Sequence, residues 1–162
     1  MYRLLIALVC LSVFATAQGK KTIRKFSIKK ETETVTEGAT TYKDGYVIYN
    51  NNGNPIEEVK YNKDGTIKKK VISKYDKNNK VIEEQHYEGN KLIKKKIFVY
   101  NAFEEKTEEL TYDAANQLVK KELYKYDKKG LKIEKKIFDG LGNLHETHIY
   151  TYQTGAKPTA DE

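Results

Sequence analysis

Residues 75–100 read YDKNNKVIEEQHYEGNKLIKKKIFVY, and this stretch decides the fold. Tyr75, Tyr87 and Tyr100 recur at intervals of 12 and 13 residues, and a cluster rich in Asn, Asp or Gly follows each of the first two. These residue types tolerate the left-handed backbone that tight hairpins require. Each unit is therefore predicted to be one β-strand, opened by an aromatic residue, together with one turn.

The same spacing of 12 to 14 residues extends along most of the chain. The aromatic residues that mark it are Tyr49, Tyr61, Tyr75, Tyr87, Tyr100, Tyr112, Tyr126, Phe138 and Tyr152. A helix is the alternative for residues 101–123, where several apolar residues also fit a helical period. The aromatic spacing continues through that segment, which favours strands. Upstream, residues 22–35 are expected to form a strand with Phe26, Ile28, Thr32 and Thr34 on one face, although Ile23 is out of step. Residues 42–46 are expected to form a hairpin turn, which gives about two further strands.

Charged residues stand eight and nine positions after most of these aromatics, and their sign alternates between units. Glu83-Glu84 is followed by Lys94–Lys96, and Glu108-Glu109 is followed by Lys120-Lys121. Opposite charges on facing strands attract, which predicts that sequential strands are neighbours. Adjacent strand residues point to opposite faces, so both faces are polar at mid-strand. The predicted fold is an all-β, open, twisted, single-layer antiparallel meander, because a sandwich would bury these charges.

The first 17 residues have the features of a signal peptide. A short basic start precedes an apolar run over residues 4–14, and Ala15-Thr16-Ala17 forms a small-residue cleavage site. The run is too short to span a bilayer. Export to the periplasm or the medium is expected, with residues 18–153 forming a single β-repeat domain and residues 154–162 a disordered tail.

The only cysteine, Cys10, lies within the predicted signal peptide. Lipidation of Cys10 is not expected, because Leu8 and Val9 precede it where a lipoprotein signal has small residues. The mature protein would contain no cysteine, so it would use no disulfide in an oxidising compartment. Its stability must then come from packing and hydrogen bonds.

The net charge of +7 is compatible with an anionic partner. Acidic and basic residues are interleaved, however, and arginine, which reads phosphate best, is almost absent from the mature chain. Nucleic acid is therefore not an expected partner. Docking on anionic lipid or polysaccharide stays open, and it would weaken as the salt concentration rises.

The segment Tyr124–Leu131, with Tyr75-Asp76 and Tyr112-Asp113, resembles the tyrosine-aspartate (YD) repeat of RHS-type bacterial surface and toxin-shell proteins. The similarity covers most of residues 49–152, but the arginine that commonly follows the glycine in that family is missing. The array is also too short to enclose a toxin. The chain is similar as well to small exported bacterial β-sheet proteins of unknown function. These resemblances imply β-hairpin architecture and a cell-envelope setting.

Candidate chemistry is sparse. His145 and His148 are three apart in a predicted strand and would face opposite ways, so a shared metal ion is not expected. The third histidine, His86, has no partner that the sequence identifies. The turns lack the converging carboxylates of a calcium loop, and paired glutamates such as Glu57-Glu58 point apart rather than flanking a substrate. No catalytic residue, metal ligand or cofactor site is predicted.

The leading hypothesis is an exported binding or structural module that presents a Lys-, Glu- and Tyr-rich sheet surface to an envelope protein or polysaccharide. Exposed edge strands could also pair with a second copy. The alternative is a small hydrolase or ligand-binding enzyme with its site in a concavity of a curled sheet. Tyrosines suit contact surfaces, and the candidate contact residues are Tyr61, Tyr75, Tyr87, Tyr100, Tyr112, Tyr126 and Tyr152.

Overall fold

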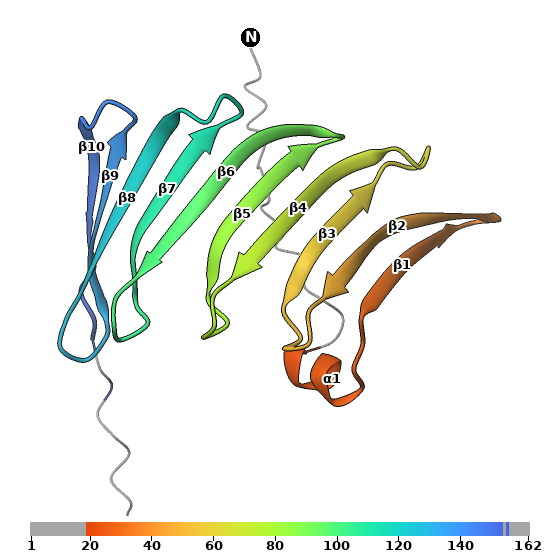
Figure 1. Cartoon of the computed structure of the whole chain (residues 1–162), viewed down its shortest axis with the longest axis horizontal. Coiled ribbons are helices and arrows are strands. Elements are labelled where there is room, and N and C mark those ends of the chain that lie inside the picture. The colour runs from red at the N-terminus through yellow and green to blue at the C-terminus, as the bar shows by residue number, and fades with distance from the viewer. Residues whose placement is uncertain (1–18, 154, 156–162) are drawn as a thin grey trace, which may run out of the picture.

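The computed structural model describes residues 19–153 and residue 155, so the predictions for residues 1–17 and for most of the tail lie outside it. Ten antiparallel strands form one open sheet in chain order, with β1 and β10 as its edges (Figure 1). The predicted all-β single-layer meander is confirmed. The strands are β1 (Lys30–Glu37), β2 (Thr40–Tyr49), β3 (Pro55–Tyr61), β4 (Ile67–Tyr75), β5 (Val81–Glu88), β6 (Lys91–Tyr100), β7 (Lys106–Asp113), β8 (Leu118–Tyr126), β9 (Lys132–Asp139) and β10 (Leu144–Ile149).

One turn design recurs along the sheet. After the aromatic residue comes an Asn or Asp whose side-chain oxygen accepts the N–H groups two and four residues later; Asp76, for example, accepts from Asn78 and Lys80 at 2.9 Å. The residue three positions on, here Asn79 at φ 64°, takes the left-handed conformation. The Asn or Asp that follows the aromatic residue therefore builds these turns. The other residues in this role are Asn50, Asn101, Asp113, Asp127 and Asp139.

The aromatic residues close the strands instead of opening them. Tyr75 is the last residue of β4, and Tyr100 is the last residue of β6. The turn side chain must follow the strand directly, and this fixes the aromatic at the strand end. Residues 101–123 contain β7 and most of β8, so the prediction of strands there is confirmed.

Successive aromatics lie on opposite faces of the sheet. The registers Ser73↔Glu84 and Glu84↔Lys96 place these three residues in one cross-strand row. Alternation along each strand then puts Tyr75, two residues after Ser73, on that same face and Tyr87 on the other. The structural repeat is therefore a hairpin of 25 or 26 residues, marked by Tyr49, Tyr75, Tyr100, Tyr126 and Tyr152.

Residues 20–25 form a helix, α1 (Lys20–Lys25), so the strand predicted over residues 22–35 is wrong in its first part. The turn predicted at residues 42–46 is wrong too, because these residues lie within β2 and the chain turns at residues 38–39. Ile23, which did not fit the strand pattern, is only 1% exposed and packs with Val47, Tyr49 and Ile28. Its burial against the sheet overrides the local strand pattern. A six-residue helix is too short to be stable alone, so this packing holds it.

The turn between β2 and β3 packs closely against α1. A Cβ at Gly53 would lie 2.9 Å from Arg24 Cγ and 3.0 Å from the Lys20 carbonyl oxygen. Gly53 also has a φ of +71°, which disfavours any residue with a Cβ. The chain therefore needs glycine here both for the turn and for the approach of the helix (Figure 1).

The alternating charges do form ion pairs between neighbouring strands. Lys74 lies 2.9 Å from Glu83, Lys121 lies 3.2 Å from Glu108, and Lys125 lies 3.0 Å from Glu134. The first charged hairpin, β3–β4, departs from this pattern. There Glu57 faces Ile72 and Glu58 faces Val71. The register brings apolar side chains, and not the Lys68–Lys70 block, opposite the two glutamates.

Candidate functional site

The seven predicted contact tyrosines lie in two rows on opposite faces. We call the face with Glu58, Glu84, Glu109 and Glu122 the glutamate face, and the opposite face the lysine–tyrosine face. The glutamate face carries Tyr75, Tyr100 and Tyr126, whereas the lysine–tyrosine face carries Tyr61, Tyr87 and Tyr112. Tyr152 lies beyond β10 and is grouped with the first three because its hydroxyl makes the same kind of hydrogen bond. The tyrosines therefore do not form one contact surface.

Tyr75, Tyr100, Tyr126 and Tyr152 each form a hydrogen bond within one hairpin. Their hydroxyl groups donate to the carbonyl oxygen of the first residue in the preceding strand, 19 or 20 positions back. Tyr75 donates to Pro55 at 2.7 Å, Tyr100 to Val81 at 2.9 Å, and Tyr126 to Lys106 at 2.9 Å. These hydroxyl groups therefore serve the fold.

Replacing Tyr100 by Phe is expected to lower the free energy of unfolding by about 1 kcal/mol, because the Val81 carbonyl loses its hydroxyl donor. Tyr112→Phe is the matched control, since no hydrogen bond of the Tyr112 hydroxyl is found within residues 19–153. Urea denaturation of both variants measures the difference. Equal losses in the two variants would show that the bond contributes nothing.

On the lysine–tyrosine face, each tyrosine lies under a lysine ammonium from a neighbouring strand. The nitrogen of Lys70 is 4.4 Å from the ring centroid of Tyr87, and that of Lys95 is 4.9 Å from Tyr112. Tyr61 lies 4.8 Å below the ammonium of Lys43. Such cation–π contacts contribute about 0.5–1 kcal/mol at exposed sites. The row thus repeats an aromatic ring and a cation once per hairpin.

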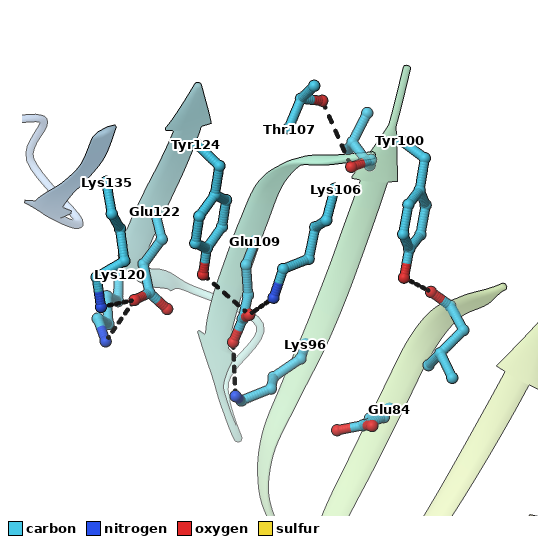
Figure 2. A network of polar contacts seen from close by, with 12 residues as sticks. Glu84, Lys96, Tyr100, Lys106, Thr107, Glu109, Lys120, Glu122, Tyr124 and Lys135 are labelled. Carbon is cyan, nitrogen blue, oxygen red and sulfur yellow. Dashed lines mark hydrogen bonds and ion pairs between the residues drawn. The ribbon is translucent and has the colours of Figure 1, made fainter. Parts of the chain in front are cut away.

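The glutamate face contains a buried polar network centred on Glu109 (Figure 2). This side chain is only 6% exposed, yet Lys96 and Lys106 each place an ammonium 2.6 Å from one of its oxygens. The Tyr124 hydroxyl donates to the same carboxylate at 3.4 Å. Burial pushes the pKa of Glu109 upward, but hydrogen bonds from Lys106 and Lys96 outweigh it and lower the pKa to about 2.

Two further features extend this network. Glu122, also 6% exposed, lies 3.3 Å from the ammonium groups of both Lys120 and Lys135. Lys106 stacks over the ring of Tyr124 at 4.7 Å, while burial and then the nearby carboxylates raise the pKa of that tyrosine. Every buried side-chain polar atom in the described part of the chain has a hydrogen-bond partner. The two buried carboxylates, Glu109 and Glu122, are each paired with two lysines.

Glu58 occupies the position equivalent to Glu109 two repeats earlier, but its neighbours differ. It lies between Val47 on β2 and Val71 on β4, with no ion pair to it among residues 19–153. Burial, and next the Glu84 carboxylate, raises the pKa of Glu58, while His86 acts in the opposite direction. At this repeat position the ionised carboxylate is thus stabilised in one hairpin, at Glu109, and destabilised in another, at Glu58.

His86 lies near Glu58 and Glu84 and forms a cluster with them, which the sequence did not predict. Its Nε2 lies 2.9 Å from Glu84 on the same strand. The pKa of Tyr75 is raised mainly by burial, next by the Glu58 carboxylate and to a smaller extent by Glu84. The missed signal is the i, i+2 spacing of Glu84 and His86, which places both on one strand face. Their arrangement brings two carboxyl groups, an imidazole and a phenol to the β3–β5 part of the glutamate face.

The other two histidines each pair with a nearby acid. His145 is 3.4 Å from Asp139, and His148 is 2.9 Å from Glu146. Within the described residues no group of three or more His, Cys, Asp or Glu side chains is arranged to hold a metal ion. No helix in the same part of the chain is long and apolar enough to cross a membrane.

No protein-family model and no curated protein sequence matches this chain. Among solved structures, it is similar to TarM from S. aureus, at 18% identity over 78% of this chain and with a TM-score of 0.33. The chain spans 22% of the length of TarM. A protein of unknown function from Bacteroides fragilis is 13% identical, over 78% of this chain and 96% of that one, with a TM-score of 0.42. The GtfA/B complex bound to UDP and GlcNAc is 11% identical over 73% of this chain and 24% of that one, with a TM-score of 0.30. These TM-scores are all below 0.5, and we draw no functional argument from them.

Proposed function

We propose that this protein is an exported, non-catalytic binding module of the bacterial cell envelope whose lysine–tyrosine face contacts an extended acidic glycan. The observation that supports this most is the repetition of Lys70–Tyr87 and Lys95–Tyr112 on successive hairpins. Neighbouring strands lie about 4.8 Å apart, so equivalent residues of successive hairpins are roughly 10 Å apart. A regular row of this kind suits a partner that is itself a linear repeat.

Each pair supplies the two contacts that an acidic sugar needs. The tyrosine ring offers apolar surface with a polar tip, and the lysine offers a cation for a carboxylate or sulfate. The tyrosines of this face are half-buried, so their orientation is fixed by the sheet while part of each ring stays accessible. Fixed rings lose little conformational entropy when a partner binds.

The test is binding of the protein to polygalacturonate, a linear polymer of acidic sugars, measured by biolayer interferometry. We expect the double substitution Tyr87→Ser with Tyr112→Ser to weaken binding by roughly 100-fold, since an aromatic contact residue contributes more than about 1 kcal/mol. Tyr75→Phe with Tyr126→Phe, on the opposite face, is the control and should leave binding unchanged.

The proposal of a glycan partner would be wrong if the wild-type protein did not bind the polymer, or if both double variants bound it equally well. Binding of an envelope protein that is lost with the Tyr87 and Tyr112 substitutions would instead identify a protein partner for the same face.

A ligand-binding site or small hydrolase on the glutamate face is the second candidate. It is favoured by the cluster of Glu58, Glu84 and His86, because the pKa of Glu58 is raised by burial and groups with perturbed pKa values gather at functional sites. It is the weaker candidate, because the acid and histidine cluster occurs once, whereas the lysine–tyrosine pairs recur on successive hairpins.

A further inference from the structure

We propose that α1 and the residues beside it form a docking site for anionic phospholipid headgroups, through which one end of the sheet rests on a membrane surface. The site comprises the basic cluster Lys20, Lys21, Arg24, Lys25 and Lys29 together with Phe26. It goes beyond the glycan-binding proposal, because it lies on α1, at the end of β1–β3, and shares no residue with the lysine–tyrosine face (Figure 1).

The first argument is unbalanced positive charge. All five basic side chains of the cluster are exposed, and none forms an ion pair with any residue from 19 to 153. Lys20, Lys21, Arg24 and Lys25 line one pocket with Asn51 of the β2–β3 turn, and Lys29 donates to Asn51 at 2.5 Å. Many lysines of the sheet, in contrast, contact acids on neighbouring strands. The charge of the sheet is largely neutralised internally, whereas that of α1 faces outward.

The second argument is that the fold holds this cluster in place. Ile23 is one of the two most buried hydrophobic side chains described, although it comes from a helix outside the repeat. Gly53 lets the β2–β3 turn approach Arg24 and Lys20 closely. A ten-strand sheet whose strands pair only with one another has no need of α1 to complete its hydrogen bonds. The docking of α1 fixes its cations in one position.

The third argument is Phe26, which follows directly after α1. Its side chain is 64% exposed, and the Lys25 ammonium lies 5.1 Å from its ring centroid. An exposed aromatic residue flanked by cations is typical of segments that bind at a membrane interface, where the ring enters the headgroup region. A soluble anion would explain the cations but would give no role to the ring, and Phe26 lacks the polar tip that the tyrosines of the lysine–tyrosine face offer to a sugar. The combination favours a lipid surface.

The number of cations in the cluster gives an estimate of how much each contributes to membrane binding. A Lys or Arg near an anionic membrane contributes about 1 kcal/mol, and the contribution falls within a Debye length. Removing two lysines should therefore weaken binding by roughly 30-fold. Raising the salt concentration should weaken it as well, because screening shortens the range of the attraction.

The experiment is sedimentation of the full chain with vesicles of phosphatidylcholine alone, or with one third phosphatidylglycerol. We expect tighter binding to the anionic vesicles than to the neutral ones. Lys20→Gln with Lys21→Gln should weaken it roughly 30-fold. Lys68→Gln with Lys69→Gln is the matched control, because these two lysines are also adjacent and exposed but stand at the start of β4, at the end of the strands away from α1 (Figure 1). All variants keep residues 1–18 unchanged, so a difference between them reports on the substituted residues.

Phe26→Ser tests the ring, with Leu141→Ser as its control, since Leu141 is 91% exposed in the β9–β10 turn at the other edge. We expect Phe26→Ser to weaken vesicle binding at least several-fold and Leu141→Ser to leave it unchanged. The proposal is overturned if neutral vesicles bind equally well, or if the two lysine pairs have the same effect. It is also overturned if only soluble polyanions such as polygalacturonate respond to the α1 substitutions. Because the glycan test uses Tyr87 and Tyr112, the two proposals fail separately.

Discussion

Replacing Glu109 by Gln is expected to lower the free energy of unfolding by about 3 kcal/mol at neutral pH. The carboxylate is almost fully buried and holds the ammonium groups of Lys96 and Lys106 at 2.6 Å. Glutamine keeps the size of the side chain but removes its charge, so two lysines would remain in a crowded site without a counter-ion. Urea denaturation at pH 7 gives the loss directly.

The pH dependence of this contribution has a definite sign. The pKa of Glu109 is about 2 in the folded protein, against 4.5 ordinarily. Its stabilisation is therefore fully present above the unfolded value and is lost as the pH falls from about 4.5 towards 2. The difference in stability between wild type and Glu109→Gln should shrink over this range. A constant difference would mean that the ion pairs are not its source.

Glu58→Gln is the matched control, because Glu58 and Glu109 occupy the same position in different repeats. The pKa of Glu58 is raised by its burial between Val47 and Val71, so the ionised carboxylate costs stability at neutral pH. The neutral glutamine should leave the free energy of unfolding unchanged or increase it. The cost disappears on acidification through the raised pKa, opposite in sign to Glu109. Equal losses from both substitutions would contradict this account.

Replacing Ile23 by Ala is expected to weaken the docking of α1 by about 3 kcal/mol, through lost burial and the cavity left beside Val47 and Tyr49. The effect is local, because α1 lies outside the strand ladder. The amide of Ile28 donates to the Ile23 carbonyl at 3.0 Å, so this amide should exchange with solvent roughly 100-fold faster.

Ile93→Ala is the control for this substitution. Ile93 lies within β6 and is 37% exposed, so its truncation removes less buried surface. The exchange rate of the Ile28 amide should not change in that variant. If Ile23→Ala left the Ile28 amide as protected as in wild type, the helix would not depend on Ile23.

The sequence predicted the strands well because its strongest signal is local. An Asn or Asp after an aromatic residue accepts two backbone N–H groups of the turn, and this needs no information from distant residues. The alternating Glu and Lys blocks then predicted the order of the strands, since the order depends only on neighbours. Both signals lie within one hairpin.

The assignment of tyrosines to faces was harder to predict, because it depends on the geometry of each turn. Most strand pairs contain a register shift near the aromatic residue, such as the one between Lys74 and Tyr75. The alternation of intervals, close to 12 and then 14, does carry a two-strand period and would have indicated a hairpin unit. The helix was missed because Ile23 is held by tertiary contacts. The network around Glu109 was missed because Lys106 reaches it from the strand end.

Each hairpin from β3–β4 onward closes upon itself, since the tyrosine hydroxyl at its end donates to a carbonyl oxygen at its own beginning. Because this hydrogen bond lies within the hairpin, a hairpin can be duplicated in the gene without requiring a new hydrophobic core. Duplication of one 26-residue segment would extend the sheet by roughly 10 Å and add one more ring and cation to the row. The length of this protein is therefore a quantity that evolution can change in whole steps, leaving every existing hairpin as it was.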